Sequence, residues 1–260
     1  MCLKIVRGAS LLALLVLLCS WAVHAANSDA LWQIVQQQCV PHWRQTQDAA
    51  PCAQVDISQG EGRGFVVLKD IRGVLQYLLI PTARISGIES PLLLRPDAPD
   101  FWAAAWDARR WMDRLHGSPL PREAVALTIN SPHGRSQNQL HIHISCVLPV
   151  LAGQLRQLPP KPVWQALPGG LNGHAYQVRA VQSEDLRGVQ PFRLLADGVA
   201  GARDEMGDYT MAIVATRFNQ APGFWLLASK ADRLAGNVGA AEGDVQDHDC
   251  RVLQAAPVSP

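Results

Sequence analysis

The sequence predicts an α+β fold in which an antiparallel sheet packs against helices. Several short runs rich in Val, Ile and Leu end at Gly, Pro or polar clusters, and one long segment repeats apolar residues at helical spacing. With 260 residues, of which 48% are hydrophobic and 17% charged, the chain can bury a substantial core. The same composition excludes a disordered chain and a charged coiled coil.

The expected elements can be placed along the chain in order. A short helix over 28–38 begins at Asn27 or Ser28 as cap, and a longer helix over 97–115 has Asp97 as its cap and Asp100 in the capping-box position. Pro81 is expected to end the second strand. The expected strands are 65–68, 74–80, 124–129, 140–147, 175–181, 211–216 and 223–228.

The chain is expected to divide into three parts. Residues 1–26 contain Lys4 and Arg7 before an apolar run and small residues, which is typical of a signal peptide; an uncleaved signal-anchor remains the alternative. The Pro-rich stretch 158–162 is the best linker candidate. It separates the region 27–157 from a β-rich C-terminal half, 158–260, that packs on the first region. Similar strand content in the two halves leaves a degenerate structural repeat open.

Export changes the interpretation of the cysteines. Four of them follow the apolar run, an even number that suits an oxidising compartment. Three pairings exist. We favour Cys39–Cys52, which closes a short loop, with Cys146–Cys250 tying the C-terminal tail to the core. The cysteine spacing contains no CxxC, so a zinc site is not expected.

The charge balance bears on the partners. The sequence carries 23 basic and 22 acidic side chains, so its net charge is +1. Nucleic-acid binding by bulk charge needs clustered Lys and Arg, and no such partner is expected. A homo-oligomeric state is left open.

The segment 130–145 is the most informative part of the sequence. In a strand, alternate side chains share one face, so Gln139, His141, His143 and Ser145 would lie together while the intervening apolar residues pack into the core. Three interpretations follow: a metal pair, which lacks a third ligand at a convincing spacing; two surface histidines without a role; or a nucleophilic histidine that attacks a phosphoryl group.

The turn before this strand contains further polar groups. His133 and Arg135 are either exposed turn residues or a positive rim for phosphate, since a guanidinium matches phosphate oxygens. Amide side chains and backbone N–H groups of the Gly-containing turn would donate to phosphate oxygens without a metal or another cofactor.

The residues 141–145, His-Ile-His-Ile-Ser, resemble the histidine-triad signature, with Ser145 in place of the third histidine. Asn130 and Gln137 precede His141 by eleven and four residues, as in that superfamily. Asp70 resembles its ribose-binding aspartate. Within the superfamily, the segment 131–146 and the tail 241–250 resemble bacterial CDP-diacylglycerol pyrophosphatases.

This resemblance implies a histidine-triad-like sheet and assigns roles by position. His143 would be the nucleophile and His141 would orient the site, while Asp70 would accept ribose hydroxyls. Ser145 cannot act as a cationic relay, so the resemblance leaves the acid for the leaving oxygen unassigned. The phosphate-binding positions fall on Gln137 and Asn138, and the position that braces the turn falls on Asn130.

The implied activity is metal-independent hydrolysis of CDP-diacylglycerol to CMP and phosphatidate through a nucleotidyl-histidine intermediate. The implied location is the periplasmic side of the bacterial inner membrane. Two alternatives remain: a hydrolase of soluble nucleotide diphosphate compounds, and a periplasmic nucleotide- or lipid-binding module without the reaction.

Overall fold

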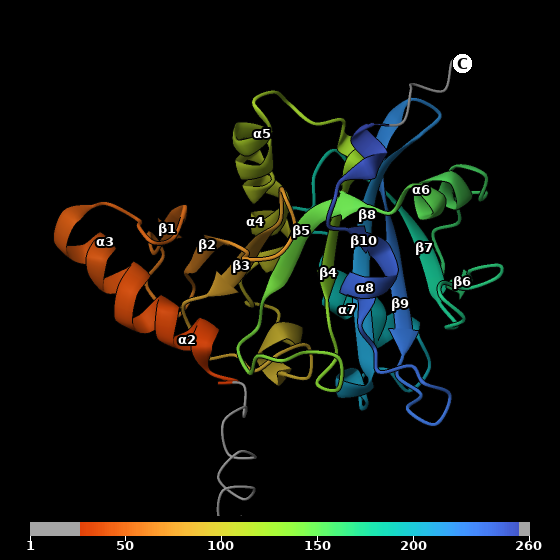
Figure 1. Ribbon diagram of the computed structural model, residues 1–260. Helices are drawn as coiled ribbons and strands as arrows, with labels where there is room; N and C mark the ends of the chain where they lie inside the picture. Colours follow the sequence, from red (N-terminus) through yellow and green to blue (C-terminus); the bar gives the residue numbers. More distant parts are fainter. Residues whose placement is uncertain (1–26, 255–260) are drawn as a thin grey trace, which may run out of the picture.

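The computed structural model describes residues 27–254 and has an α+β fold built on one ten-stranded sheet (Figure 1). The strands run in the order β1-β2-β3-β5-β4-β8-β9-β7-β6, and every paired neighbour is antiparallel. The strands are β1 (Gln54–Asp56), β2 (Phe65–Lys69), β3 (Tyr77–Pro81), β4 (Val125–Ile129), β5 (Ile142–Val147), β6 (Gln165–Ala166), β7 (Gln177–Gln182), β8 (Tyr209–Phe218), β9 (Ala221–Lys230) and β10 (Gln246–Asp247).

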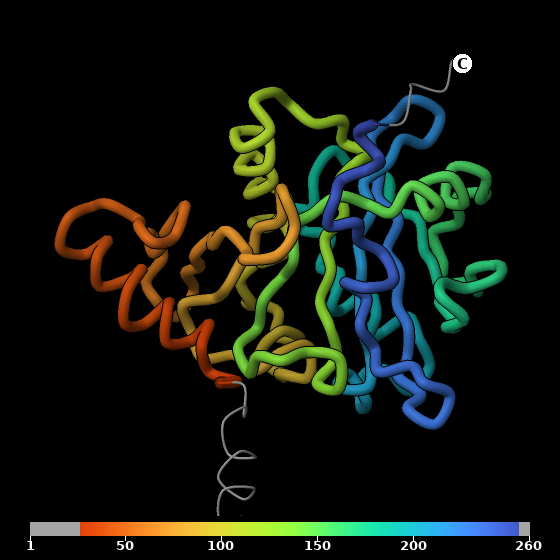
Figure 2. Tube along the Cα trace, in the orientation of Figure 1, coloured from red at the N-terminus to blue at the C-terminus, as the bar shows by residue number. Residues whose placement is uncertain are grey.

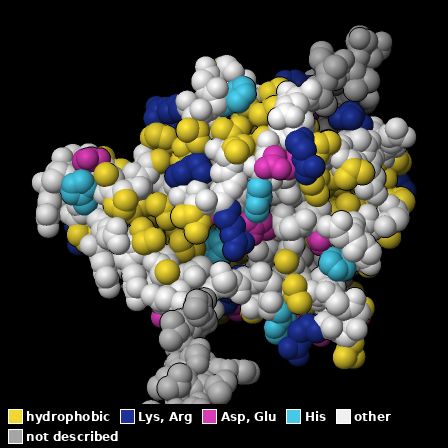
Figure 3. Space-filling view, viewed as in Figure 1, with side chains coloured by type: hydrophobic (Ala, Val, Ile, Leu, Met, Phe, Trp, Pro, Cys, Tyr) yellow, Lys and Arg dark blue, Asp and Glu magenta, His cyan; other side chains and the backbone are white. Residues whose placement is uncertain are grey.

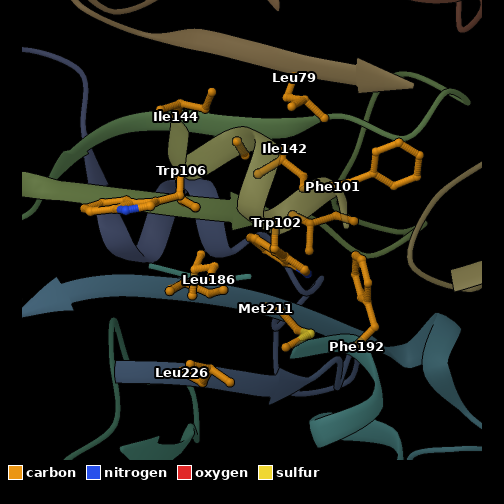
Figure 4. Close-up of a cluster of buried hydrophobic side chains, with 14 of the residues drawn as sticks. Leu79, Phe101, Trp102, Trp106, Ile142, Ile144, Leu186, Phe192, Met211 and Leu226 are labelled. Atoms are coloured by element: carbon orange, nitrogen blue, oxygen red, sulfur yellow. The ribbon is translucent and has the colours of Figure 1, made fainter. Parts of the chain in front are cut away.

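One face of the sheet packs against three helices. Aromatic side chains of α4 (Phe101–Ala108) and α7 (Pro191–Gly198) meet the apolar face of the central strands (Figure 4). α5 (Arg110–His116) continues the layer through Met112. Trp102 and Phe192 lie 5.4 Å apart, centroid to centroid. Ile142 and Ile144 belong to this core, which confirms the inward face predicted for their strand.

The opposite face carries two separate helical groups. The N-terminal helix, made of α2 (Ala30–Ile34), a π-helical segment (Val35–Cys39) and α3 (Val40–Thr46), packs on β2 and β3. Helices α6 (Pro149–Arg156) and α8 (Ala241–Val245) pack on β4, β8 and β9. The histidine-bearing face of β5 lies between these groups, so it is open to a cavity.

The C-terminal segment returns to β5. β10 pairs with β5 beyond the end of β3, with Asp247 opposite Cys146. In the tube view, the C-terminal segment runs back beside the middle of the chain (Figure 2). Cys146 is bonded to Cys250, so the segment that contains α8 and β10 is covalently tied to the histidine strand. The second disulfide joins Cys39 to Cys52, and together they form the favoured pairing.

Two expectations for the segment 97–115 were wrong. The segment 97–115 forms two helices that meet at Arg109, where backbone N–H groups bond three residues back rather than four. The cap is Asp100, whose carboxylate accepts from the Ala103 amide at 3.1 Å, because Pro99 disfavours helical backbone before it. Asp97 is instead paired with Arg95.

The expected linker does not interrupt the sheet. β4, before residues 158–162, pairs with β8, after them. Residues 1–26, expected to form the export segment, lie outside the described residues. Within 27–254, every helix is too short or too polar to cross a membrane.

Candidate active site

The histidine-bearing face of β5 opens into a cavity of about 390 Å³ between the two helical groups. The N-terminal helix forms one wall and α8 the other, and the hairpin loop after β2 lies at the rim. The cavity is lined by Ala30, Leu31, Ile34, Leu68, Lys69, Asp70, Ile71, Arg72, Leu78, Asn130, Gly134, Arg135, Ser136, Gln137, His141, His143 and Glu242.

His143 is buried at the base of this cavity, and its Nδ1 faces three polar side chains. Glu242 Oε1 lies 3.4 Å away, Asp70 Oδ2 3.9 Å away and Gln76 Nε2 3.2 Å away. The Gln76 amide donates to Asp70 at 2.8 Å and to Glu242 at 3.0 Å, which uses both of its hydrogens. Nδ1 therefore carries its own hydrogen toward Glu242, and Nε2 keeps its lone pair.

The protonation state of His143 suits a nucleophile. Burial lowers its pKa below the ordinary value, against the opposing effect of Glu242 and Asp70. Nε2 is buried and has no hydrogen-bond partner among the described residues. The ring is therefore neutral at pH 7, with an unprotonated nitrogen available for bond formation.

His141 supports the same site without contributing a charge. Its Nδ1 donates to the Gln139 carbonyl at 2.7 Å, and its ring meets that of His143 at 4.8 Å between centroids. Burial lowers the pKa of His141 to about 4, and the nearby His143 contributes a smaller part of this shift. His141 is therefore a neutral side chain that packs beside His143.

Glu242 is the main residue that sequence reasoning missed. Its backbone N–H donates to Asn130 Oδ1 at 3.1 Å, and its Oε1 lies 3.2 Å from His248 Nε2. Burial alone would raise the pKa of Glu242, but His143, Gln76 and the other nearby donors together hold it below the ordinary value. Glu242 is therefore an anion held against His143. The available signal was its place in the tail 241–250.

Comparison with known proteins identifies the family of this chain. A family model described as CDP-diacylglycerol pyrophosphatase matches residues 26–254. A CDP-diacylglycerol pyrophosphatase from Yersinia pestis is 47% identical over 235 residues, which cover 90% of this chain and 88% of that protein. This chain belongs to the CDP-diacylglycerol pyrophosphatase family. A solved DUF4931 family protein from Bacillus cereus ATCC 10987 is 14% identical and covers 67% of this chain and 85% of its own, with a TM-score of 0.39.

In this member of the CDP-diacylglycerol pyrophosphatase family, the turn before β5 connects the two walls of the cavity. Asn130 holds Glu242 on one side. Gln137 accepts from the Leu31 amide at 3.1 Å and donates to the Asn27 carbonyl at 3.0 Å, so its side chain is occupied by the N-terminal helix. The side chains of Asn138 and His133 are exposed and do not line the cavity.

The two arginines near the site differ in their partners. Arg135 forms two 2.7 Å hydrogen bonds with Glu89 and is nearly buried, so its charge is already neutralised. Gly87 makes room for it, because a Cβ there would lie 2.0 Å from Arg135 Nη1. Arg72 is exposed at the cavity rim, and within residues 27–254 its guanidinium forms no ion pair. It is the better placed of the two for phosphate.

Two residues of the predicted histidine face do not line the cavity. Gln139 is fully buried and donates to the carbonyls of Pro81 at 3.0 Å and Ala83 at 2.8 Å, so it fixes the entry to β5. Ser145 is fully buried, and its hydroxyl has no partner in the described part of the chain. Alternation along the strand placed both on the right face, but packing against neighbouring elements covers them.

The expectation that the histidines lack a third ligand was wrong. Asp70 and Glu242 join His143 in a cluster whose ligand atoms lie within 4.8 Å of one another. The Gln76 amide nitrogen occupies the middle of this cluster and satisfies both carboxylates. A cation there would have to displace that amide.

Proposed function

We propose that this cavity is where the chain carries out its family's reaction, the hydrolysis of CDP-diacylglycerol to CMP and phosphatidate, with His143 as the nucleophile. The observation that carries the proposal is the neutral, buried His143 whose Nδ1–H faces Glu242 and whose Nε2 is unpartnered among the described residues. A histidine-triad-like arrangement of β4, the turn and β5 would supply this geometry. The periplasmic side of the inner membrane, with residues 1–26 as signal or anchor, would be the location.

The reaction would proceed in two displacements. His143 Nε2 attacks the phosphorus that bears cytidine, a P–N bond forms, and the bond to the bridging oxygen breaks, so phosphatidate leaves with that oxygen. Water then attacks the same phosphorus, breaks the P–N bond and releases CMP, restoring the imidazole. The Glu242 carboxylate stabilises the positive charge that the ring carries in between.

The remaining side chains would bind and orient the substrate. Arg72 supplies a guanidinium for the pyrophosphate oxygens. Asp70 lies close enough to the nucleophile to accept ribose hydroxyls from a bound nucleotide. Asn130 and Gln137 act as positioning residues, because they hold Glu242 and the N-terminal helix.

The test is a covalent adduct. Full-length protein is mixed with CDP-diacylglycerol labelled in the cytidine, quenched early and separated under denaturing conditions. We expect label on the wild-type chain and on His116→Ala, a control at an exposed histidine, but none on His143→Ala. Released CMP with no adduct at any time would show that water, and not His143, attacks the phosphorus. If neither CMP nor an adduct forms, the result favours a binding module without the reaction.

The acidic cluster supports one second candidate, a metal-dependent hydrolase. Three ligand atoms around His143 could hold a divalent cation if Gln76 moved. Dialysis against a chelator distinguishes the two mechanisms. Turnover that survives chelation supports attack by His143 alone, and turnover that is lost and then restored by one divalent metal supports the metal site.

A further inference from the structure

The cavity has two chemically different sides. Its polar side contains the histidines, Asp70, Glu242 and Arg72. Its other side is apolar and is formed by Ala30, Leu31, Ile34, Leu68, Ile71 and Leu78. Figure 3 shows hydrophobic side chains beside a central group of basic, acidic and histidine side chains. The cytidine and the two phosphates of the substrate would occupy only the polar side of the cavity.

The hairpin loop between β2 and β3 presents apolar side chains to solvent at the rim. Ile71 is 99% exposed and Val74 is 57% exposed, in a loop that begins with Asp70 at the nucleophile. Leaving an isoleucine in water forfeits the free energy of burying it. The neighbouring Arg72 is a cation, and an apolar side chain next to a cation suits the surface of an anionic lipid layer.

The sequence before α2 also indicates that a lipid layer lies near the cavity. The apolar run of the sequence ends at residue 23, and α2 begins at Ala30 on the cavity wall. Seven residues span about 25 Å at most, so any lipid layer that held the run would lie near the cavity.

We infer that this apolar side, with Ile71 at its edge, is the subsite for the acylated glycerol of the substrate, which enters from a lipid surface touching the β2–β3 loop. The inference rests on the proposed function. It explains why the wall opposite Glu242 is built from a helix with apolar side chains. The phosphates then lie between Arg72 and His143, and the cytidine occupies the polar remainder.

The test compares two substrates of the full-length protein in detergent micelles: CDP-diacylglycerol and CDP-glycerol, which lacks the acyl chains. The measured quantity is the ratio of kcat/KM for the lipid to kcat/KM for CDP-glycerol. Ile71→Ser should lower this ratio about tenfold, since the lost apolar contact is of that size. Because the ratio compares two substrates of one sample, partial misfolding does not change it.

Leu234→Ser is the matched control, because Leu234 is also fully exposed and does not line the cavity. Its ratio should equal that of the wild type. An unchanged ratio in Ile71→Ser overturns the lipid subsite while leaving the hydrolysis intact. A wild type that hydrolyses neither substrate removes the proposed function itself, and the subsite with it.

Discussion

Glu242 Oε1 lies 3.4 Å from His143 Nδ1, although one residue belongs to α8 and the other to β5, far apart in the sequence. Two features bring them together: β10 pairs with β5, and Asn130 accepts from the Glu242 amide. The carboxylate therefore holds the imidazole in the tautomer that leaves Nε2 unprotonated. This is the arrangement by which a buried acid orients a histidine.

Replacing this carboxylate should change both the rate and the pH profile. In Glu242→Gln, we expect kcat to fall about 100-fold or more, since the developing imidazolium loses its anion. Activity requires neutral His143, so it declines as the pH falls through the pKa of His143. Glu242 raises that pKa, and its removal should move the acid limb of kcat/KM to lower pH. The pH profile measures this shift.

Glu123→Gln is the control, because Glu123 forms an exposed ion pair with Arg217 away from the cavity. Its kcat and acid limb should match those of the wild type. An acid limb in Glu242→Gln that stays in place or moves to higher pH would show that the carboxylate does not act on His143.

The two arginines should separate binding from stability. Arg72→Gln removes a guanidinium without an ion pair in the described chain, and should lower kcat/KM about 10- to 100-fold with the free energy of unfolding unchanged. Arg135→Gln leaves Glu89 without its partner and should lower the free energy of unfolding by about 1–3 kcal/mol. Steady-state kinetics and urea unfolding of both variants test this prediction. A loss of kcat/KM in Arg135→Gln and a loss of stability in Arg72→Gln would show that Arg135, and not Arg72, binds the phosphates.

The strand geometry of the site could be predicted from the sequence, whereas its partners could not. Alternation along β5 is a local property, so His143 and Ile142 were assigned to the correct faces. Gln76 and Glu242 reach His143 through pairing of β3 and β10 with β5, which depends on contacts between distant segments. The ion pair between Arg135 and Glu89 could not be predicted, because Glu89 lies in a loop without a sequence pattern.

The disulfides should differ in their effect on activity. Cys146–Cys250 encloses a sequence separation of 104 and ties the segment of Glu242 to β5, whereas Cys39–Cys52 encloses 13 and joins the N-terminal helix to the loop before β1. The chain-entropy model gives about 4.7 and about 3 kcal/mol for loops of such sizes. Replacing the first pair by serine should therefore lower both stability and kcat more than replacing the second. Equal losses of kcat would show that the tie does not position Glu242.

His141 should make the stability of the protein depend on pH. Its pKa is about 4 in the folded chain, against about 6.5 when unfolded, so between these values the unfolded chain binds the extra proton. Stability is therefore lost as the pH falls from 6.5 toward 4. His141→Asn retains a donor for the Gln139 carbonyl but cannot titrate, and its unfolding free energy should fall less over this range, by about 1–2 kcal/mol. Urea unfolding at pH 6.5 and 4.5 measures the difference.

His116→Asn, at an exposed histidine, should behave as the wild type. If His141→Asn loses as much stability as the wild type, His141 is protonated in the folded chain, and it would then present a positive charge to the phosphates rather than a neutral ring.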